Sequence, residues 1–196
     1  MKKIPTLFKR EFSNNHVVSI TDEVTPGCEW VLKGEGCATI KVDGACCCVY
    51  KGKFYKRYDA KNGSPPPKGA IPCGKPDAVT GHWPHWLLVD KHKPEDRWFV
   101  EAYKNRKKKS NRRVLTDGTY EAIGPHFRNN PYHLASDTLV KHGTVIIDVE
   151  RTFNGIREFL QNHDDMEGIV FWKDGRPGCK IKRTDFGFKW DGMPNK

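Results

Sequence analysis

The sequence predicts an α+β fold built mainly from antiparallel strands. Apolar, aromatic or β-branched runs of strand length recur along the chain, for example at Trp83–Asp90 and Leu139–Val149. One segment, Phe153–Asn162, places its apolar residues at helical spacing on one face. The strand-like runs do not alternate with helical patterns, so the parallel sheet of a βαβ protein is not expected.

Turn residues group several of these runs into hairpins. Lys51-Gly52 predicts a hairpin turn that leads into Lys53–Asp59. Near the end of the chain, Gly168–Trp172 and Gly178–Lys182 predict a last hairpin that turns at Lys173–Pro177.

The region from residue 97 to residue 113 is predicted as a strand followed by a loop. Arg97–Tyr103 is an apolar, aromatic run of strand length, whereas the basic run Lys104–Arg113 is polar and lacks periodicity. We therefore expect the basic run to form a surface loop. A run of this kind is usually a solvated surface, and contact with a phosphate backbone is the alternative.

Length and composition limit the class of protein. A chain of 196 residues and 22.5 kDa corresponds to about one domain, and we expect a single domain over residues 1–196. Hydrophobic residues make up 37% and aromatic residues 11%, which is too much for a disordered chain. There is no apolar run of about 18 residues and no recognisable secretory signal, so no membrane partner is expected.

The net charge and the cysteine pattern indicate the kind of partner and the redox compartment to expect. A formal net charge of +10 is explained either by solubility or by a polyanionic partner such as nucleic acid or a nucleotide phosphate. The seven cysteines include three consecutive ones at 46–48, and no Cys-x-x-Cys pair occurs. This pattern favours neither a disulfide framework nor a structural zinc site. We expect the cysteines to act as small apolar residues in a reducing, cytoplasmic compartment.

A set of short motifs carries the candidate chemistry. Lys41-Val42-Asp43-Gly44 follows a strand-like run, and a second Lys-x-Asp-Gly stands near the end of the chain at Lys189-Trp190-Asp191-Gly192, with no strand after it. We take the first copy as the informative one. Lone acids, Glu121 and Glu167, each lie in or open an apolar run. Lys180 and Lys182 are two positions apart, which places both on one face of a strand.

In this order the motifs resemble the covalent nucleotidyltransferase superfamily of polynucleotide ligases and RNA capping enzymes. Within it, the sequence is most similar to ATP-dependent RNA ligases, particularly a small group related to the vertebrate 5′–3′ RNA ligase. The resemblance runs from about Thr39 to Lys182. It implies a nucleotidyltransferase (ATP-grasp-like ligase adenylation) domain of packed antiparallel sheets with flanking helices. Only residues 183–196 follow the last motif, so no OB-fold is expected.

The resemblance also implies roles for particular residues. Lys41 would be the nucleophile that becomes a lysyl-AMP, and Lys180 and Lys182 would neutralise the α-phosphate of ATP. Arg57 would contact ribose or phosphate oxygens. The remaining residues of the expected site are Glu121 on a ribose hydroxyl, Glu167 on Mg²⁺ (or Mn²⁺) with Glu121 sharing that metal, and Val170 with the backbone at Ile40 around adenine. The partner would be RNA with 5′-phosphate and 3′-hydroxyl ends, and the oligomeric state stays open.

Elementary chemistry agrees with these roles. A lysine amine attacks phosphorus only when it is neutral, and nearby cations together with desolvation favour that form. Two ammonium groups on one strand face would also stabilise the charge that develops on the phosphate oxygens. A carboxylate is repelled by phosphate, so an acid in such a site would contact a hydroxyl or a metal.

Each motif also has a simpler interpretation. Lys41, Lys180 and Lys182 could be solvated strand lysines, and Glu121 and Glu167 could be charges on edge strands that prevent aggregation. His142 could be a structural histidine or a nucleotide contact. Two other functions remain as alternatives to ATP-dependent RNA ligation: a GTP-dependent guanylyltransferase of the capping type, and an RNA-binding protein without enzymatic activity.

Overall fold

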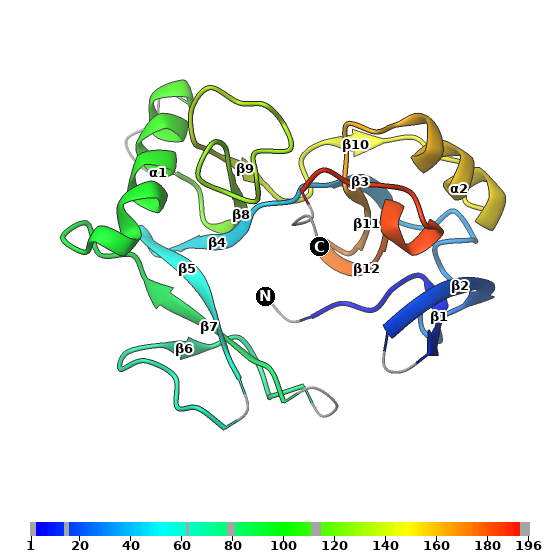
Figure 1. The fold of residues 1–196 in the computed structure, drawn as a ribbon, viewed down its shortest axis with the longest axis horizontal. Coiled ribbons are helices and arrows are strands. Elements are labelled where there is room, and N and C mark those ends of the chain that lie inside the picture. Colours follow the sequence, from blue (N-terminus) through cyan, green and yellow to red (C-terminus); the bar gives the residue numbers. More distant parts are fainter. Residues whose placement is uncertain (1–2, 14–15, 62, 78–80, 111–114, 193–196) are drawn as a thin grey trace. The chain divides into compact units, whose positions relative to one another are not determined.

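The computed structural model describes residues 3–13, 16–61, 63–77, 81–110 and 115–192 (Figure 1). Contacts divide the chain into two compact units, and each is described here by itself. Unit 1 consists of Met1–Lys3 and Gly44–His142, and unit 2 consists of Ile4–Asp43 and Gly143–Lys196. The prediction of one domain over residues 1–196 stays a prediction, as does the packing of the two sheets on each other.

Unit 1 contains a six-stranded antiparallel sheet in the order β6-β7-β5-β4-β8-β9. Its elements are β4 (Ala45–Tyr50), β5 (Lys53–Ala60), β6 (Ile71–Pro72), β7 (Trp83–Leu88), η1 (Pro94–Asp96), α1 (Arg97–Ser110), β8 (Gly118–Ile123) and β9 (Thr138–Lys141). The helix α1 covers one face of this sheet. Its Ala102 packs in one core with Cys47, Val49, Tyr120 and Leu139.

Unit 2 contains a four-stranded antiparallel sheet in the order β10-β3-β11-β12 and a separate two-stranded hairpin. Its elements are β1 (Phe8–Ser13), β2 (His16–Val24), β3 (Cys37–Lys41), β10 (Ile146–Ile147), α2 (Phe153–Asn162), β11 (Gly168–Lys173), β12 (Arg176–Lys182) and η2 (Arg183–Phe186). Ile156 and Leu160 of α2 are buried against Ile169, Phe171 and Ile181 on one face of the four-stranded sheet.

The α+β class and the hairpins predicted from the sequence are confirmed. Lys51 and Gly52 both have positive φ, 49° and 72°, which is the conformation of a two-residue turn between twisted strands. Asp174 and Gly175 repeat it between β11 and β12, with φ of 51° and 70°. The predicted helix Phe153–Asn162 is confirmed with the same bounds.

The helix begins where a cap is available. The side-chain oxygen of Thr152 accepts a hydrogen bond of 3.0 Å from the Gly155 N–H, which satisfies one of the free donors of the first turn.

The prediction for residues 97–113 is wrong. Arg97–Tyr103 is not a strand, and the basic run is not a loop up to residue 110, because α1 extends over both. A short apolar run fits a strand or a buried helix equally well. Trp98, Phe99, Ala102 and Tyr103 all pack on the sheet, which is helical spacing, and lysine and arginine favour helices. Residues 111–113 of the predicted loop lie outside the described residues.

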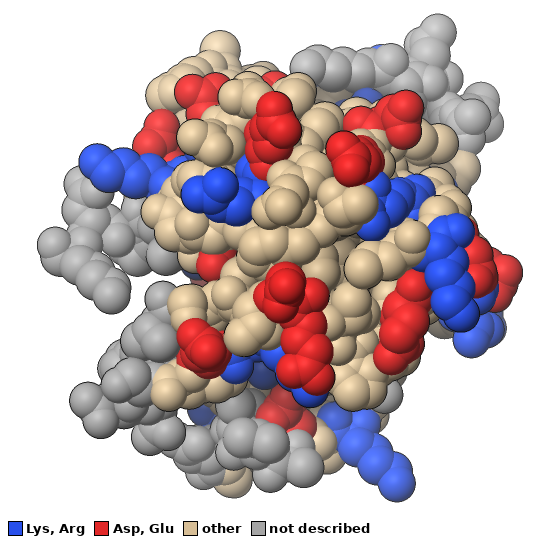
Figure 2. All heavy atoms as spheres, turned by 90° about the vertical axis from the view of Figure 1, so that its right-hand side faces the viewer, with Lys and Arg blue, Asp and Glu red and all other residues tan. Residues whose placement is uncertain are grey.

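Charge is mixed on the face drawn in Figure 2. Acidic and basic side chains alternate there among uncharged ones. The positive charge of the sequence is therefore not gathered into one basic patch on this face. In the described part of the chain, no helix combines the length and the apolar character needed to cross a membrane.

Candidate functional site

Three of the predicted motifs meet in one row across the sheet of unit 2. Gly168, the first residue of β11, pairs with Lys41 on β3 and with Lys182 on β12. Residues directly opposite each other in antiparallel strands have their side chains on the same face. The register therefore brings Lys41 and Lys182 to the two sides of Gly168 on the face that α2 does not cover. We call these residues the lysine row.

Glycine at position 168 is required by close packing. A Cβ added there would lie 2.2 Å from the Ile181 carbonyl oxygen and 2.8 Å from the Lys182 Cα, and real Cβ atoms do not come this close to backbone. The missing side chain of Gly168 lets β12 approach β11 and bring Lys182 into the row.

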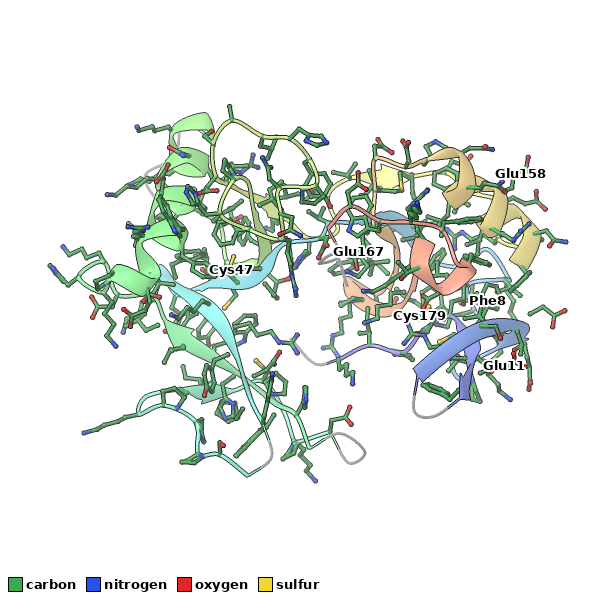
Figure 3. The ribbon with its side chains drawn as sticks, in the orientation of Figure 1. Phe8, Glu11, Cys47, Glu158, Glu167 and Cys179 are labelled. Atoms are coloured by element: carbon green, nitrogen blue, oxygen red, sulfur yellow. The ribbon has the colours of Figure 1, made fainter. Side chains whose placement is uncertain are left out.

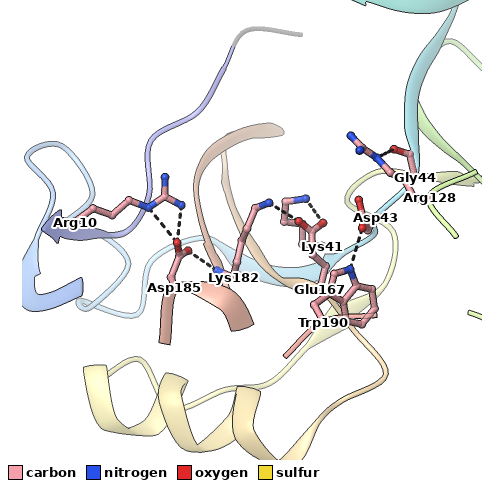
Figure 4. Close-up of polar contacts among 9 residues, drawn as sticks. All are labelled: Arg10, Lys41, Asp43, Gly44, Arg128, Glu167, Lys182, Asp185 and Trp190. Atoms are coloured by element: carbon pink, nitrogen blue, oxygen red, sulfur yellow. Dashed lines mark hydrogen bonds and ion pairs between the residues drawn. The ribbon is translucent and has the colours of Figure 1, made fainter. Parts of the chain in front are cut away.

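Glu167 joins the two lysines (Figure 4). Its side chain is only 4% exposed. One carboxylate oxygen, Oε2, accepts from Lys41 Nζ, and the other, Oε1, is 2.6 Å from Lys182 Nζ. Burial alone would raise the pKa of Glu167, but Lys41 and Lys182 together hold it below its usual value. The carboxylate is thus ionised and carries the counter-charge of the row.

Lys180 lies in the next row on the same face, opposite Val170, which in turn pairs with Thr39. In the part of the chain that the structure describes, Lys180 forms no ion pair. Desolvation, followed by the charges of Lys41, Lys182 and Arg10, lowers the pKa of Lys180 to about 8. A cation in this position is destabilised until an anion binds beside it.

Beside the lysines, Thr39, Val170 and Trp172 are joined by hydrogen bonds. The Thr39 hydroxyl donates to the Val170 carbonyl at 3.2 Å and accepts from the Trp172 indole N–H at 2.9 Å. The Trp172 ring lies against Gly143, where an added Cβ would be 3.1 Å from it. Val170 was predicted from the sequence as a site residue, but Thr39 and Trp172 were not. Their alternation with the core residues of the same strands was the available signal.

Ile40 lies on the opposite face from the lysine row. Its side chain packs against the core of unit 2, and its N–H donates to the Val145 carbonyl at 3.0 Å. Only the carbonyl group of Ile40 therefore remains for the adenine contact that was predicted at this backbone.

The second Lys-x-Asp-Gly copy contacts the first. The buried Trp190 donates its indole N–H to Asp43 Oδ2 at 2.9 Å, and a Cβ on Gly192 would lie 2.2 Å from the same oxygen. Figure 4 shows the Trp190 ring below Asp43. Asp43 therefore holds the C-terminal segment through this hydrogen bond.

The other predicted residues belong to unit 1. Arg57 on β5 and Glu121 on β8 lie on the face of the six-stranded sheet that α1 does not cover. Tyr55, Cys48 and Thr119 pair in one row across β5, β4 and β8, so their side chains share a face. Arg57 is two positions from Tyr55, and Glu121 is two positions from Thr119, so both point to that same face. The Arg57 Nε donates to Asp59 Oδ1 at 2.9 Å.

Glu121 is 9% exposed and is held by His142. The His142 Nε2 is 2.8 Å from Glu121 Oε2, and its Nδ1 is 3.0 Å from the Thr119 hydroxyl. From the sequence, His142 could have either a structural or a nucleotide-binding role. The contact makes it the residue that orients Glu121.

Two simpler interpretations of the acids are wrong. Glu121 lies on β8, between β4 and β9, and Glu167 immediately precedes β11, between β3 and β12. Neither is a charge on an edge strand. Because both are buried, each carboxylate needs the partner that the structure gives it.

All seven cysteines are free, and four of them, Cys28, Cys47, Cys48 and Cys179, are buried as small apolar residues are. Cys47 and Cys179 lie in the cores of the two units (Figure 3). Burial and the nearby Glu121 raise the pKa of Cys46 to about 12. The thiol of Cys46 therefore stays protonated at neutral pH and is no nucleophile.

Among the described residues, no group of three or more His, Cys, Asp or Glu side chains could hold a metal ion. The predicted ligand Glu167 faces three lysines, which oppose a resident divalent cation. The residues of unit 2 therefore fit Mg²⁺ only as an ion that arrives with the negative charge of ATP phosphates.

No protein-family model matches this chain, and no curated protein matches it.

Proposed function

We propose that the protein is an ATP-dependent RNA ligase that joins 5′-phosphate and 3′-hydroxyl RNA ends through a lysyl-AMP intermediate. One observation carries the proposal: Lys41, Glu167 and Lys182, from three distant motifs, are joined by ion pairs in one row, with Lys180 beside them. Separate solvated lysines would not need a shared buried carboxylate.

The first step forms a covalent intermediate. The Lys41 Nζ attacks the α-phosphorus of ATP, an N–P bond forms, and the bond from that phosphorus to the bridging oxygen of the β-phosphate breaks. Pyrophosphate leaves, and the amine gives up its protons to solvent. Lys180 and Lys182 stabilise the negative charge on the α-phosphate oxygens as the bond forms.

The proton on Lys41 is the obstacle to this step. In the nucleotide-free protein Lys41 is ion-paired with Glu167, and an ammonium group has no lone pair for attack. Mg²⁺ bound with ATP would supply Glu167 with another cation in exchange for the Lys41 ammonium.

The next two steps join the RNA. An oxygen of the RNA 5′-phosphate attacks the α-phosphorus of the adenylate, and the N–P bond breaks with return of a proton to Lys41. The RNA 3′-hydroxyl then attacks the 5′-phosphorus, a phosphodiester forms, and AMP leaves. By the resemblance, Val170 would contact adenine, and the ribose roles expected of Arg57 and Glu121 stay predictions.

Mass spectrometry of the protein incubated with ATP and Mg²⁺ tests the proposal. We expect the added mass of one adenylyl group on Lys41, removed again by pyrophosphate, and no such addition on the Lys41→Ala variant. GTP in place of ATP distinguishes the capping alternative, because it would add a guanylyl group instead. A wild-type protein that binds RNA but takes up no nucleotide under either condition would support the non-enzymatic alternative and overturn the proposal.

A further inference from the structure

The lysine row continues beyond Lys182 to an arginine that no sequence motif identified. Arg10, on β1, donates its Nε at 3.0 Å and its Nη2 at 2.6 Å to Asp185 Oδ1. The other oxygen of Asp185, Oδ2, accepts the Lys182 N–H at 2.8 Å. Asp185 therefore ties the arginine to the strand end that carries Lys182 (Figure 4).

The contacts connect Lys41, Glu167, Lys182, Asp185 and Arg10 in a fixed order. Glu167 lies between two ammonium groups, whereas Asp185 joins the Arg10 guanidinium to the backbone N–H of Lys182. The two carboxylates therefore hold the basic residues close together. All five residues belong to unit 2.

The group carries an excess of positive charge. Four cations, Arg10, Lys41, Lys180 and Lys182, accompany two carboxylates. The charge of Arg10 reaches Lys180, because it is one of the causes that lower the Lys180 pKa. An anion with at least two negative charges would balance the group, as a polyphosphate does.

Arg10 has donors left for such a ligand. A guanidinium group has five N–H donors, and the hydrogen bonds to Asp185 use two of them. The Arg10 side chain is 27% exposed, whereas Asp185 is only 4% exposed. The carboxylate thus fixes the arginine from the buried side and leaves its outer side open to solvent.

The geometry of the reaction indicates which part of ATP lies near Arg10. In phosphoryl-type transfer the attacking and leaving atoms lie roughly in line on opposite sides of phosphorus. When Lys41 attacks from one end, the pyrophosphate departs away from Lys41, which is the direction of Lys182 and Arg10 in the order of contacts.

We propose that Arg10 binds the leaving pyrophosphate of the adenylylation step and that Asp185 positions it. The inference rests on the proposed function. As the bond between the α-phosphorus and the bridging oxygen breaks, negative charge grows on the pyrophosphate, and the guanidinium stabilises it. In the reverse reaction the same contact binds pyrophosphate for attack on the lysyl-AMP.

The test separates the step that releases pyrophosphate from the steps that do not. In the Arg10→Gln variant, we expect adenylylation by ATP to slow about tenfold or more, since a charge-assisted hydrogen bond to phosphate is lost. The pyrophosphate concentration for half-maximal reversal should rise by a similar factor. Sealing of RNA that already carries a 5′-adenylate should stay within about twofold of wild type, because that reaction involves no pyrophosphate.

A neighbouring residue gives a matched control. Lys9 is adjacent on β1 and forms an exposed ion pair with Glu23, so Lys9→Gln removes the same charge without touching Asp185. It should leave both rates and the pyrophosphate concentration for half-maximal reversal unchanged. If Arg10→Gln does not fold, Arg10→Lys carries the same comparison, because it keeps the charge but loses the forked contact.

The outcomes are distinct. Equal losses in adenylylation and in sealing of pre-adenylated RNA would mean that Arg10 only stabilises the fold, and no loss in either would mean that it is not used; both overturn the inference. A wild-type protein that forms no lysyl-AMP overturns the proposed function itself.

Discussion

Lys41 and Lys182 bind opposite oxygens of one carboxylate, that of Glu167, from the two strands that flank β11. The carboxylate is buried while the lysines are partly exposed. The Glu167 carboxylate, more than the surrounding water, therefore balances the positive charges of Lys41 and Lys182. Without nucleotide, this carboxylate is what allows three lysines to share one sheet face.

Replacing Glu167 should therefore weaken the nucleotide-free fold. We expect Glu167→Gln to cost about 2 kcal/mol of unfolding free energy at pH 7, because two ammonium groups lose their shared partner. That corresponds to a fall of about 5 °C in the melting temperature, and millimolar phosphate should restore part of it. Glu23→Gln, which breaks only an exposed pair with Lys9, should change stability by less than about 0.5 kcal/mol.

The pH dependence of this difference has a definite sign. The pKa of Glu167 is lowered in the fold, so its contribution is present above its unfolded value, about 4.5, and is lost as pH falls through the folded value. Thermal melts at a series of pH values from 7 downward should show the difference between the wild type and Glu167→Gln shrinking as the pH falls below about 4.5. A constant difference would contradict the assigned ion pairs.

Replacing Lys180 should raise the stability of the protein and weaken ATP binding, whereas replacing Glu167 should lower stability. The pKa of Lys180 is about 8 in the fold and 10.5 when unperturbed, so the unfolded chain binds more protons between these values. Stability then rises with pH across that window, and the charged lysine is a cost below it. We expect Lys180→Met to be more stable than the wild type at pH 7 by about 1 to 2 kcal/mol and to bind ATP at least tenfold more weakly.

Melting curves from pH 7 to pH 10.5 and ATP titrations check both parts. The stability advantage of Lys180→Met should disappear toward pH 10.5, where the wild-type lysine is neutral. A variant that is less stable than wild type at pH 7 would show that Lys180 has a stabilising partner instead.

Local sequence patterns predicted much of the fold and named the lysines of the site, but they did not predict which side chains those lysines contact. The hairpin turns and the helix Phe153–Asn162 follow from residues within a few positions of each other, which is why they were predicted well. The lysines of the row were named from motifs. That Glu167 binds both Lys41 and Lys182 depends on strand register, and no pattern within a single strand specifies it.

The errors have physical causes as well. The helix α1 was predicted as a strand and a loop because a short apolar run has no period of its own. Arg10 was missed because its role depends on Asp185, far away in the sequence. Trp190 was set aside as part of a coincidental repeat, yet its indole donates to Asp43.

Gly168 offers a test of the row that leaves its charges unchanged. Gly168→Ala places a methyl group within 2.2 Å of the Ile181 carbonyl oxygen, so β11 and β12 must separate. We expect a loss of about 2 kcal/mol or more in unfolding free energy and a large fall in adenylylation, as Lys182 moves away from Glu167. Gly74→Ala is the control, since an added Cβ there meets nothing within 4 Å. Equal behaviour of the two variants in melting and labelling would show that the close approach is unimportant.

Trp190 is the residue that positions the nucleophile motif from the far end of the chain. Its indole N–H holds Asp43, two positions after Lys41. Arg183 helps to fix the segment, because its Nε donates to the Lys189 carbonyl at 3.1 Å. We expect Trp190→Phe, which keeps an aromatic ring but loses the donor, to cost about 1 kcal/mol of stability. Adenylylation at saturating ATP should slow about three- to tenfold, with the KM for ATP unchanged, because the variant alters the placement of Lys41 and not the phosphate contacts.

Two further variants distinguish positioning from a general loss of stability. Trp83→Phe removes another indole hydrogen bond, that to the Gly74 carbonyl at 2.7 Å, and should leave the adenylylation rate unchanged. Gly192→Ala should reproduce the effect of Trp190→Phe, because its methyl group would collide with the same Asp43 oxygen. Equal rate losses in Trp83→Phe and Trp190→Phe would mean that the contact with Asp43 has no special part in the reaction. A loss confined to Trp190→Phe and Gly192→Ala ties the C-terminal segment to the reactivity of Lys41.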